Sequence, residues 1–326
     1  MSEPARQAQG SRSERIAVVG AGLMGTSIAL DWARAGFSVT VYDSDGDRVD
    51  SLTRRAREIG QALVETGVIT ANELNLAVAR LTGSVDLGEA VGDADYVAEA
   101  IVENLAVKQS LYAELDAVTR PDAVLASNTS TLMPSALAEP VHNRGRLLVA
   151  HYFNPAHLIP VVEVVLGPET TPEAVETTTR LLREAGKTPA VLRKEVPGFI
   201  ANRLQSALLR EALALVEDGV CSMEDLDAVV SLGFGRRLAA FGPFVVHDMA
   251  GLDVWHAIAT NLYPEISDAK EPQRTLTELA ARGDFGLKSG RGFYEWSPTE
   301  AAAALAKRDA ELLRHLVPSK QGDSDD

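Results

Sequence analysis

The sequence predicts an α/β domain with a mostly parallel sheet, followed by an all-helical domain. Short β-branched runs alternate with amphipathic stretches through residues 14–195, which is typical of a parallel sheet covered by helices on both faces. From Phe199 onward the apolar spacing is helical, and we find no convincing strand. The pattern changes at the stretch KEVPGF, so we expect the α/β domain to end at about residue 195 and the helical domain to cover 196–316.

The first strand, helix and strand occupy fewer than 30 residues. RIAVVG (15–20) is a short apolar run that ends in a glycine, and SVTVYD (38–43) is a second, β-branched run. The stretch between them, residues 23–35, is amphipathic and stops at Gly36. This is the span of a βαβ unit, the building block of a doubly wound sheet.

Further strands and helices continue the alternation. One helix is expected to begin with Thr171 as its N-cap and Pro172 in its first turn, and to end at Gly186. In the helical domain, Ser222 and Asp225 resemble a capping box that follows a long helix over 199–219. The later predicted strands are DYVAEAIV (95–102), AVLASNT (123–129), RLLVAHYF (146–153), VVEVVLG (161–167) and TPAVLRK (188–194).

Composition excludes several classes of partner. A chain of 326 residues with a net charge of −15 is a poor match for nucleic acid or an anionic membrane surface. No apolar run approaches the length of a membrane span, and residues 1–13 lack the apolar region of a signal peptide. Cys221 is the only cysteine, which suits a reducing compartment, so we expect a cytoplasmic protein. No metal site is expected. Residues 1–13 and 317–326 are expected to be disordered tails.

Three glycines in a G-x-G-x-x-G spacing follow the first strand and open the first helix. Asp43 ends the second strand 23 residues after Gly20, which is where a dinucleotide site places its acid. The helix N-terminus attracts a pyrophosphate, and Asp43 accepts hydrogen bonds from ribose hydroxyls while repelling a 2′-phosphate. A Rossmann-type domain that binds NAD is therefore predicted. The loop residues assigned to the cofactor are Gly20, Gly22, Leu23, Met24 and Gly25.

Polar side chains gather where later strands end. Asn128 and Ser130 follow one strand, His151 ends the next, and Glu163 stands alone among valines. The carboxyl ends of parallel strands form the ligand edge of such a sheet. A carboxylate among valines is costly to bury without a partner, so we expect Glu163 to pair with His151, fix its tautomer and raise its basicity.

These residues match the needs of hydride transfer from an alcohol. The reaction requires a base for the hydroxyl proton and donors to hold the carbonyl oxygen that forms. We assign the base to His151 and the donors to Ser130 and Asn202. Asn202 has a second interpretation as a simple capping or packing residue.

Eight motifs follow one another along the chain: GAGLMGTSIA, EAIVENLAVK, LASNTS, HYFNP, VVEVV, VPGFIANRL, GPF…DMAGLD and GLKSGRGFY. Together they resemble the 3-hydroxyacyl-CoA dehydrogenase family over residues 15–296. The resemblance implies a helical domain that forms a homodimer, a catalytic pair at His151 and Glu163, and substrate contacts from Ser130 and Asn202. It also implies further NAD contacts from Glu103, Lys108, Asn128, Asn154 and Lys288.

Four stretches carry a second resemblance: LMPSALAEPVH, AHYFNPAHLIPVVEVV, GPETTP and KEVPGFIANRLQSAL. They are similar to the lambda-crystallin and L-gulonate dehydrogenase branch of the same superfamily, which oxidises a free hydroxy acid. Acyl-CoA members tend to carry lysine and serine on the helical excursion after the second strand, but residues 45–70 contain no lysine here. Arg54, Arg55 and Arg57 are the available substitutes, because arginine binds phosphate well.

Three small-molecule substrates share the predicted chemistry. We rank a short-chain 3-hydroxyacyl-CoA first, as in fatty acid metabolism. A free hydroxy acid of the L-gulonate or 3-hydroxybutyrate type is second, and a polyketide-type β-keto intermediate is third. A non-catalytic NAD-binding or crystallin-like protein ranks last, since it needs neither His151 nor Glu163.

Overall fold

The computed structural model describes residues 14–316, so the expectations for 1–13 and 317–326 lie outside the described residues. It divides into two compact units. The first unit runs to Ile200 and also includes the chain from Arg308, and the second is Ala201–Lys307. The division thus follows Ile200, whereas the sequence places the domain boundary between residues 195 and 196.

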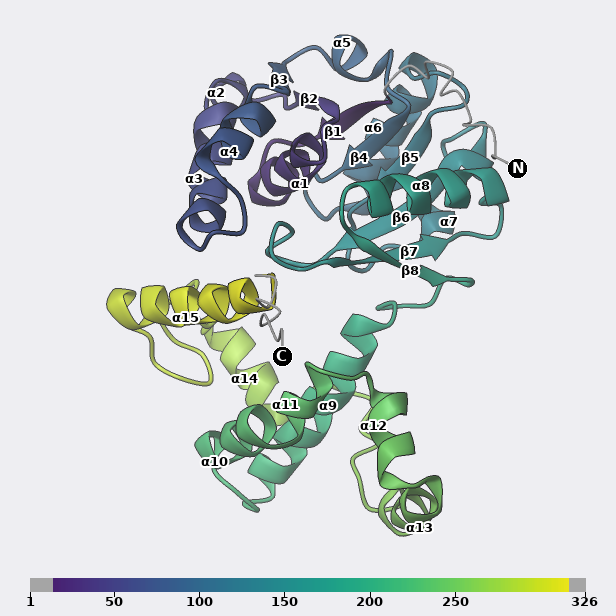
Figure 1. Ribbon diagram of the computed structural model, residues 1–326. Helices are drawn as coiled ribbons and strands as arrows, with labels where there is room; N and C mark the ends of the chain where they lie inside the picture. The colour runs from purple at the N-terminus through teal and green to yellow at the C-terminus, as the bar shows by residue number, and fades with distance from the viewer. Residues whose placement is uncertain (1–13, 317–326) are drawn as a thin grey trace, which may run out of the picture. The chain divides into compact units, whose positions relative to one another are not determined.

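The first unit is built on an eight-stranded sheet with the order β3-β2-β1-β4-β5-β6-β7-β8 (Figure 1). Neighbouring strands are parallel except for β6 and β7, which are antiparallel. The strands are β1 Arg15–Val19, β2 Ser38–Tyr42, β3 Leu81–Ser84, β4 Tyr96–Glu99, β5 Val124–Ser127, β6 Leu147–Tyr152, β7 Val161–Leu166 and β8 Thr188–Leu192. The predicted doubly wound, mostly parallel sheet is confirmed.

Helices cover both faces of this sheet, and two separate clusters of buried apolar side chains fill the spaces beneath them. The helices are α1 Leu23–Arg34, α2 Gly46–Asp50, α3 Leu52–Glu65, α4 Ala71–Val78, α5 Leu87–Val91, α6 Leu105–Val118, α7 Pro134–Leu137 and α8 Pro172–Glu184. Thr171 caps α8 as predicted, accepting a hydrogen bond from the backbone N–H of Ala174.

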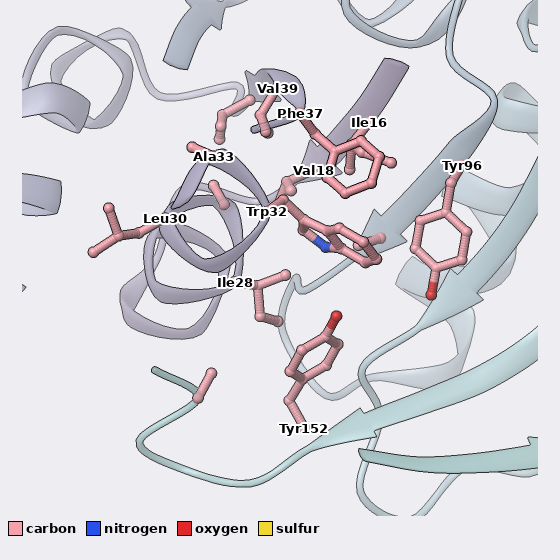
Figure 2. Close-up of a cluster of buried hydrophobic side chains, with 14 of the residues drawn as sticks. Ile16, Val18, Ile28, Leu30, Trp32, Ala33, Phe37, Val39, Tyr96 and Tyr152 are labelled. Atoms are coloured by element: carbon pink, nitrogen blue, oxygen red, sulfur yellow. The ribbon is translucent and has the colours of Figure 1, made fainter. Parts of the chain in front are cut away.

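The larger of the two clusters fixes the first helix on the sheet. Trp32 of α1 is fully buried, and its ring centroid lies 5.5 Å from those of Phe37 and Tyr96 (Figure 2). Aromatic pairs at this separation add to the free energy that burial alone supplies. This packing fixes α1, which begins directly after the glycine loop, on the sheet.

The second unit is helical, as predicted. Its helices are α9 Ala201–Glu217, α10 Met223–Ala228, a π-helical turn Val229–Phe234, α11 Gly235–Leu238, α12 Pro243–Ala250, α13 Leu252–Leu262 and α14 Arg274–Arg282, followed by the beginning of α15 Pro298–Leu316. Ser222 caps α10 by accepting the backbone N–H of Asp225 at 3.0 Å, in line with the sequence. Among the described helices, no single one is long and apolar enough to cross a membrane, and one sharply bent pair (Met223–Leu238 with Pro243–Ala250) meets that test only jointly.

The end of α15 belongs to the first unit. Leu313 is buried in a small cluster with Leu63 of α3 and with Leu158. The chain therefore leaves the α/β unit after Ile200 and returns to it from Arg308.

Candidate active site

The three glycines of the loop between β1 and α1 differ in how the surrounding structure constrains them. Gly20 has a φ of +105°, and a Cβ there would lie 2.7 Å from the Ala100 carbonyl oxygen. A Cβ on Gly25 would lie 1.8 Å from the Gly20 carbonyl oxygen. A Cβ on Gly22 would meet nothing within 4 Å. Gly20 and Gly25 are thus required by the protein's own packing, whereas Gly22 borders open space.

The N-terminus of α1 fits a bound pyrophosphate. Gly22 is its N-cap and offers no side-chain acceptor, and the first turn carries no acidic residue. The first backbone N–H groups and the partial positive charge of the helix therefore face the space beside Gly22. Leu23, at the start of the helix, is 67% exposed, which leaves an apolar surface for the cofactor to cover.

Asp43 at the end of β2 holds the glycine loop in place. Its Oδ2 accepts the backbone N–H of Ala21 at 2.7 Å, and its Oδ1 accepts that of Asp45 at 3.0 Å. Arg48 lies 3.6 Å from Oδ2. Each carboxylate oxygen has a further lone pair, and its contact with ribose hydroxyls stays a prediction.

His151 and Glu163 lie directly opposite each other on the antiparallel strands β6 and β7. The His151 Nδ1 is 2.8 Å from the Glu163 Oε2, and both side chains are buried. The other carboxylate oxygen, Oε1, accepts the backbone N–H of Ile200 at 2.9 Å. The contact expected from the lone acid in VVEVV is present. An ionised carboxylate accepts the hydrogen bond, so Nδ1 is the donor beside Glu163, and the contact of Nε2 with substrate stays a prediction.

Two aromatic rings pack against the imidazole. The ring centroid of Phe153 lies 5.0 Å from that of His151, and Phe199 lies at 5.6 Å. Phe199 is fully buried and has a φ of +52°, the one positive φ of a non-glycine residue in the described chain. A phenylalanine rarely adopts this conformation, and such outliers occur at functional sites. Nothing in the sequence indicates it except the preceding Pro197-Gly198.

Asn128 joins the ends of three strands. Its backbone N–H donates to the Glu99 carbonyl at 2.7 Å, and its side-chain Oδ1 accepts the N–H of Tyr152 at 2.8 Å. Tyr152 follows His151 directly, so Asn128 fixes the loop of Ser130 relative to the imidazole strand. Asn154 lies in the loop that leaves the same strand.

Glu103 binds the loop of Ser130. Its Oε1 accepts the backbone N–H groups of Ser130 and Thr131 at 3.0 and 3.2 Å, and the hydroxyls of Thr129 and Thr131. Burial raises the pKa of Glu103, but the hydrogen bond from Thr129 and the charge of Lys108 outweigh it, so the pKa lies below its usual range. Glu103 is therefore a carboxylate that organises this loop, whatever else it contacts.

Lys108 is 1% exposed and forms an ion pair with Glu99, which is itself fully buried at the end of β4. Sequence reasoning missed Glu99. The available signal was the one used for Glu163, an acid alone in an apolar strand. The stretch DYVAEAIV has this pattern, but the helix that supplies Lys108 is not visible from it.

Two further predicted residues belong to the helical unit. Asn202 lies in the first turn of α9, and Lys288 lies in the loop closed by the bridge between Gly286 and Arg291. Lys288 borders a cavity of about 570 Å³ together with Asp284 and Phe285. Their contacts with substrate and cofactor stay predictions.

A doubly wound sheet with this glycine loop, and with a buried His–Glu pair beyond it, is typical of an oxidoreductase that uses a nicotinamide dinucleotide. The family model for the NAD binding domain of 3-hydroxyacyl-CoA dehydrogenase matches residues 15–196, and that for the C-terminal domain matches 198–296. The chain therefore belongs to the 3-hydroxyacyl-CoA dehydrogenase family, as its motifs predicted, and its cofactor is NAD.

Similar proteins extend over nearly the whole chain. It is 35% identical over 298 residues to 5-formyl-3-hydroxy-2-methylpyridine 4-carboxylate 5-dehydrogenase of Mesorhizobium japonicum, covering 91% of this chain and 96% of the relative. It is 39% identical over 307 residues to L-carnitine dehydrogenase of Streptomyces griseus, covering 92% and 88%. A crystal structure of a 5-formyl-3-hydroxy-2-methylpyridine 4-carboxylic acid 5-dehydrogenase, described as an NAD⁺ dependent dismutase, matches with a TM-score of 0.86 at 34% identity, covering 93% of this chain and 97% of that one.

Proposed function

We propose that this NAD-dependent oxidoreductase interconverts the hydroxyl and carbonyl forms of a small free hydroxy acid, with His151 as the catalytic base and acid. One observation carries the proposal: the buried imidazole whose Nδ1 lies 2.8 Å from the Glu163 carboxylate. General acid–base catalysis by such a group contributes on the order of 10²- to 10⁴-fold to the rate.

In the oxidation direction, His151 Nε2 accepts the hydroxyl proton while the carbinol hydrogen leaves as hydride. Bound NAD supplies the hydride acceptor. Glu163 holds the imidazole in the tautomer with a proton on Nδ1 and stabilises the imidazolium that forms. Ser130 and Asn202 are proposed to donate hydrogen bonds to the carbonyl oxygen as it develops. Reduction runs through the same groups in reverse, with Nε2 returning the proton.

The arginines of α3, in the segment 45–70 after β2, support a substrate without a nucleotide. Arg54 pairs with Glu58 at 2.7 Å. Arg55 donates to the Arg48 carbonyl at 2.9 Å. Arg57 donates to the Asn75 side chain. Each of these guanidinium groups is therefore engaged on its own surface, and a CoA phosphate would have to displace those partners.

The names of two relatives favour the same class of substrate. The two curated relatives described above are named for a pyridine carboxylate and for carnitine, not for a thioester. This reverses the order that the sequence predicts, in which the short-chain acyl-CoA comes first. The acyl-CoA stays the second candidate, because the family model that matches the chain is named for it.

The test compares NADH consumption on acetoacetate and acetoacetyl-CoA at matched concentrations, with NAD⁺ reduction on L-carnitine and 3-hydroxybutyrate as further free acids. We expect kcat/KM for the preferred free acid to exceed that for the thioester at least tenfold. A CoA preference of 10²-fold, about 2.7 kcal/mol of transition-state binding, overturns the free-acid assignment. Turnover of neither, with NADH still bound, favours a bulkier β-keto substrate of the polyketide type.

We further propose that the enzyme works as a homodimer through its helical domain and resides in the cytoplasm. Large apolar side chains are exposed on that domain, among them Phe244 at 87% and Met249 at 70%, and a second copy is the partner that the family resemblance implies. The single Cys221 is in keeping with a reducing compartment.

A further inference from the structure

The loop at residues 153–160 joins the two strands of the buried His–Glu pair. β6 carries His151, β7 carries Glu163, and the loop connects the end of one strand to the start of the other. It forms neither helix nor strand, and it contains Asn154, which the family resemblance assigns to NAD. Buried backbone polar groups need hydrogen-bond partners, so those of an irregular loop depend on side chains from other elements. The groups that hold this loop therefore bear on both strands and on the predicted cofactor contact.

Lys187, one residue before β8, supplies two of these partners. Its ammonium donates to the backbone carbonyls of Ala156 at 2.6 Å and of Ile159 at 3.2 Å. It also lies 2.7 Å from Oδ2 of Asp31 in α1, and both side chains of this ion pair are buried. A lysine ammonium has three N–H donors, and a buried ion pair persists when further hydrogen bonds satisfy the donors that remain. The loop carbonyls meet that need, so the ion pair and the loop stabilise each other.

A second contact joins the loop to the same helix. The Ser27 hydroxyl of α1 accepts the backbone N–H of His157 at 3.1 Å, and it lies 2.9 Å from Nδ1 of the same residue. Burial lowers the pKa of His157, although the charge of Asp31 opposes this shift. The imidazole is therefore uncharged at pH 7, and the contact with Ser27 joins two neutral groups.

The two anchors of α1 lie on one face of the helix. Ser27 and Asp31 are four residues apart, which places their side chains one above the other. The helix begins directly after the glycine loop. On another side of the loop, Leu158 packs with Leu63 of α3 and Leu313 of α15. One face of the helix that opens the cofactor site thus holds the loop between the two strands.

We propose that Lys187, Asp31 and Ser27 are positioning residues, which hold the loop 153–160 on α1 and thereby set Asn154 against the bound cofactor. This inference deepens the proposed function and rests on the assignment of Asn154 to NAD. The observation that carries it is that both anchors belong to the helix that begins at the glycine loop, so a single helix fixes two sides of the cofactor site. Small displacements matter there, because a misplacement of about 1 Å costs on the order of 10²-fold in rate.

The test uses the full chain with the double substitution Asp31→Asn and Lys187→Met, which removes both charges and the two hydrogen bonds to the loop. The matched control is Asp116→Asn with Arg146→Met. Arg146 is also buried, pairs with Asp116 and donates to two backbone carbonyls, but it lies just before β6, at the end of the strand away from the loop. Both double variants are expected to lower the melting temperature.

Three readouts separate a positioning role from a purely structural one. Hydrogen exchange of the 157–159 amides reports on the loop, fluorescence titration gives NADH affinity, and steady-state kinetics gives kcat and KM. We expect the Asp31 and Lys187 double variant to exchange these amides at least tenfold faster, to bind NADH at least threefold more weakly and to lose at least tenfold in kcat. The control is expected to keep all three at wild-type values despite its lower melting temperature.

Ser27→Ala is a milder variant that keeps the inference testable if the double variant does not fold. Alanine suits a buried helix position, and the substitution removes the hydroxyl that accepts the His157 N–H. We expect the His157 amide to exchange at least tenfold faster and NADH to bind more weakly. Thr178→Ala is the control, because its buried hydroxyl bonds within α8 to the Ala174 carbonyl.

Two outcomes overturn the inference. Wild-type exchange of the 157–159 amides in the variants shows that other contacts hold the loop. Faster exchange combined with the NADH affinity of the controls shows that the loop is held but does not set the cofactor contact. Both readouts need no substrate, so they decide the matter even if every tested hydroxy acid fails and the proposed function fails with it.

Discussion

The two units of this protein bury their apolar side chains very differently. The α/β unit fills two large clusters, and residues such as Trp32, Tyr96 and Tyr112 are fully enclosed. In the described part of the helical unit, Leu213 and Leu279 are the buried hydrophobic residues, while most of the exposed large ones lie there. The first unit completes its own core, whereas the second leaves apolar helix faces exposed, and exposed apolar faces are a common feature of interaction surfaces.

Charges follow the same division. The α/β unit encloses the ion pairs Asp116–Arg146, Glu99–Lys108 and Asp31–Lys187. The described ion pairs of the helical unit involve exposed arginines. Buried polar networks specify one arrangement of the groups they join. The unit with the completed core is therefore the one that fixes the geometry of the proposed catalysis.

The largest effect is expected from His151→Gln. Removing the base lowers kcat on the true substrate by on the order of 10²- to 10⁴-fold, while NADH affinity stays within threefold. Steady-state kinetics and a fluorescence titration measure the two quantities. His142→Gln is the control, because His142 is exposed and pairs with Asp116 away from this site. Near-normal turnover by His151→Gln contradicts the assigned mechanism.

A pair of glycine variants separates packing from cofactor binding. Gly25→Ala places a Cβ against the Gly20 carbonyl, so both NADH affinity and melting temperature are expected to fall. Gly22→Ala meets open space, so we expect an unchanged melting temperature and an NADH affinity at least tenfold weaker. Normal NADH binding by Gly22→Ala would show that the pyrophosphate lies elsewhere.

The exposed faces of the helical unit are tested by Phe244→Glu. If this ring lies in a dimer contact, the charge weakens self-association at least tenfold, as seen by sedimentation or light scattering over a range of concentrations. Leu76→Glu, on an exposed apolar residue of the α/β unit, is the matched control and is expected to change nothing. A wild-type protein that is monomeric at every concentration contradicts the dimer.

The smallest effect concerns acid stability. Burial opposes ionisation of Asp116, but hydrogen bonds from Arg146 and His142 lower its pKa from 3.8 to about 2. The ionised group stabilises the folded state above about pH 4, and this contribution is lost as pH falls towards 2. Asp116→Asn should therefore cost on the order of 1–2 kcal/mol at pH 6 in urea unfolding, and about half as much at pH 3. Asp50 is exposed, so the control variant Asp50→Asn should leave the free energy of unfolding almost unchanged at either pH. If Asp116→Asn lowers the free energy of unfolding by the same amount at both pH values, this ion pair is contradicted.

The sequence predicted the parts of the fold that local patterns encode. The glycine loop, the Thr171 cap and the strands with β-branched runs are of this kind, and all are present. The edge strand Leu81–Ser84 was not predicted, because LTGS lacks such a run and depends on its pairing with β2.

The site was predictable where a charged residue stands within an apolar strand. Glu163 among valines indicated a buried partner, and His151 lies directly across from it. The amide of Ile200 and the left-handed Phe199 come from a distant segment, and the Glu99–Lys108 pair joins a strand to a helix. Such contacts are created by tertiary packing, so no local pattern indicates them.

The central claim is that His151 and Glu163 act as one catalytic unit, and a double-mutant cycle tests it most directly. The measurement is kcat for His151→Gln, Glu163→Gln and the double variant, with NADH affinity checked in each. Because Glu163 acts through the imidazole, we predict that the double variant is no slower than His151→Gln alone. Losses that multiply in the double variant would show that the two residues act independently, and would contradict the account.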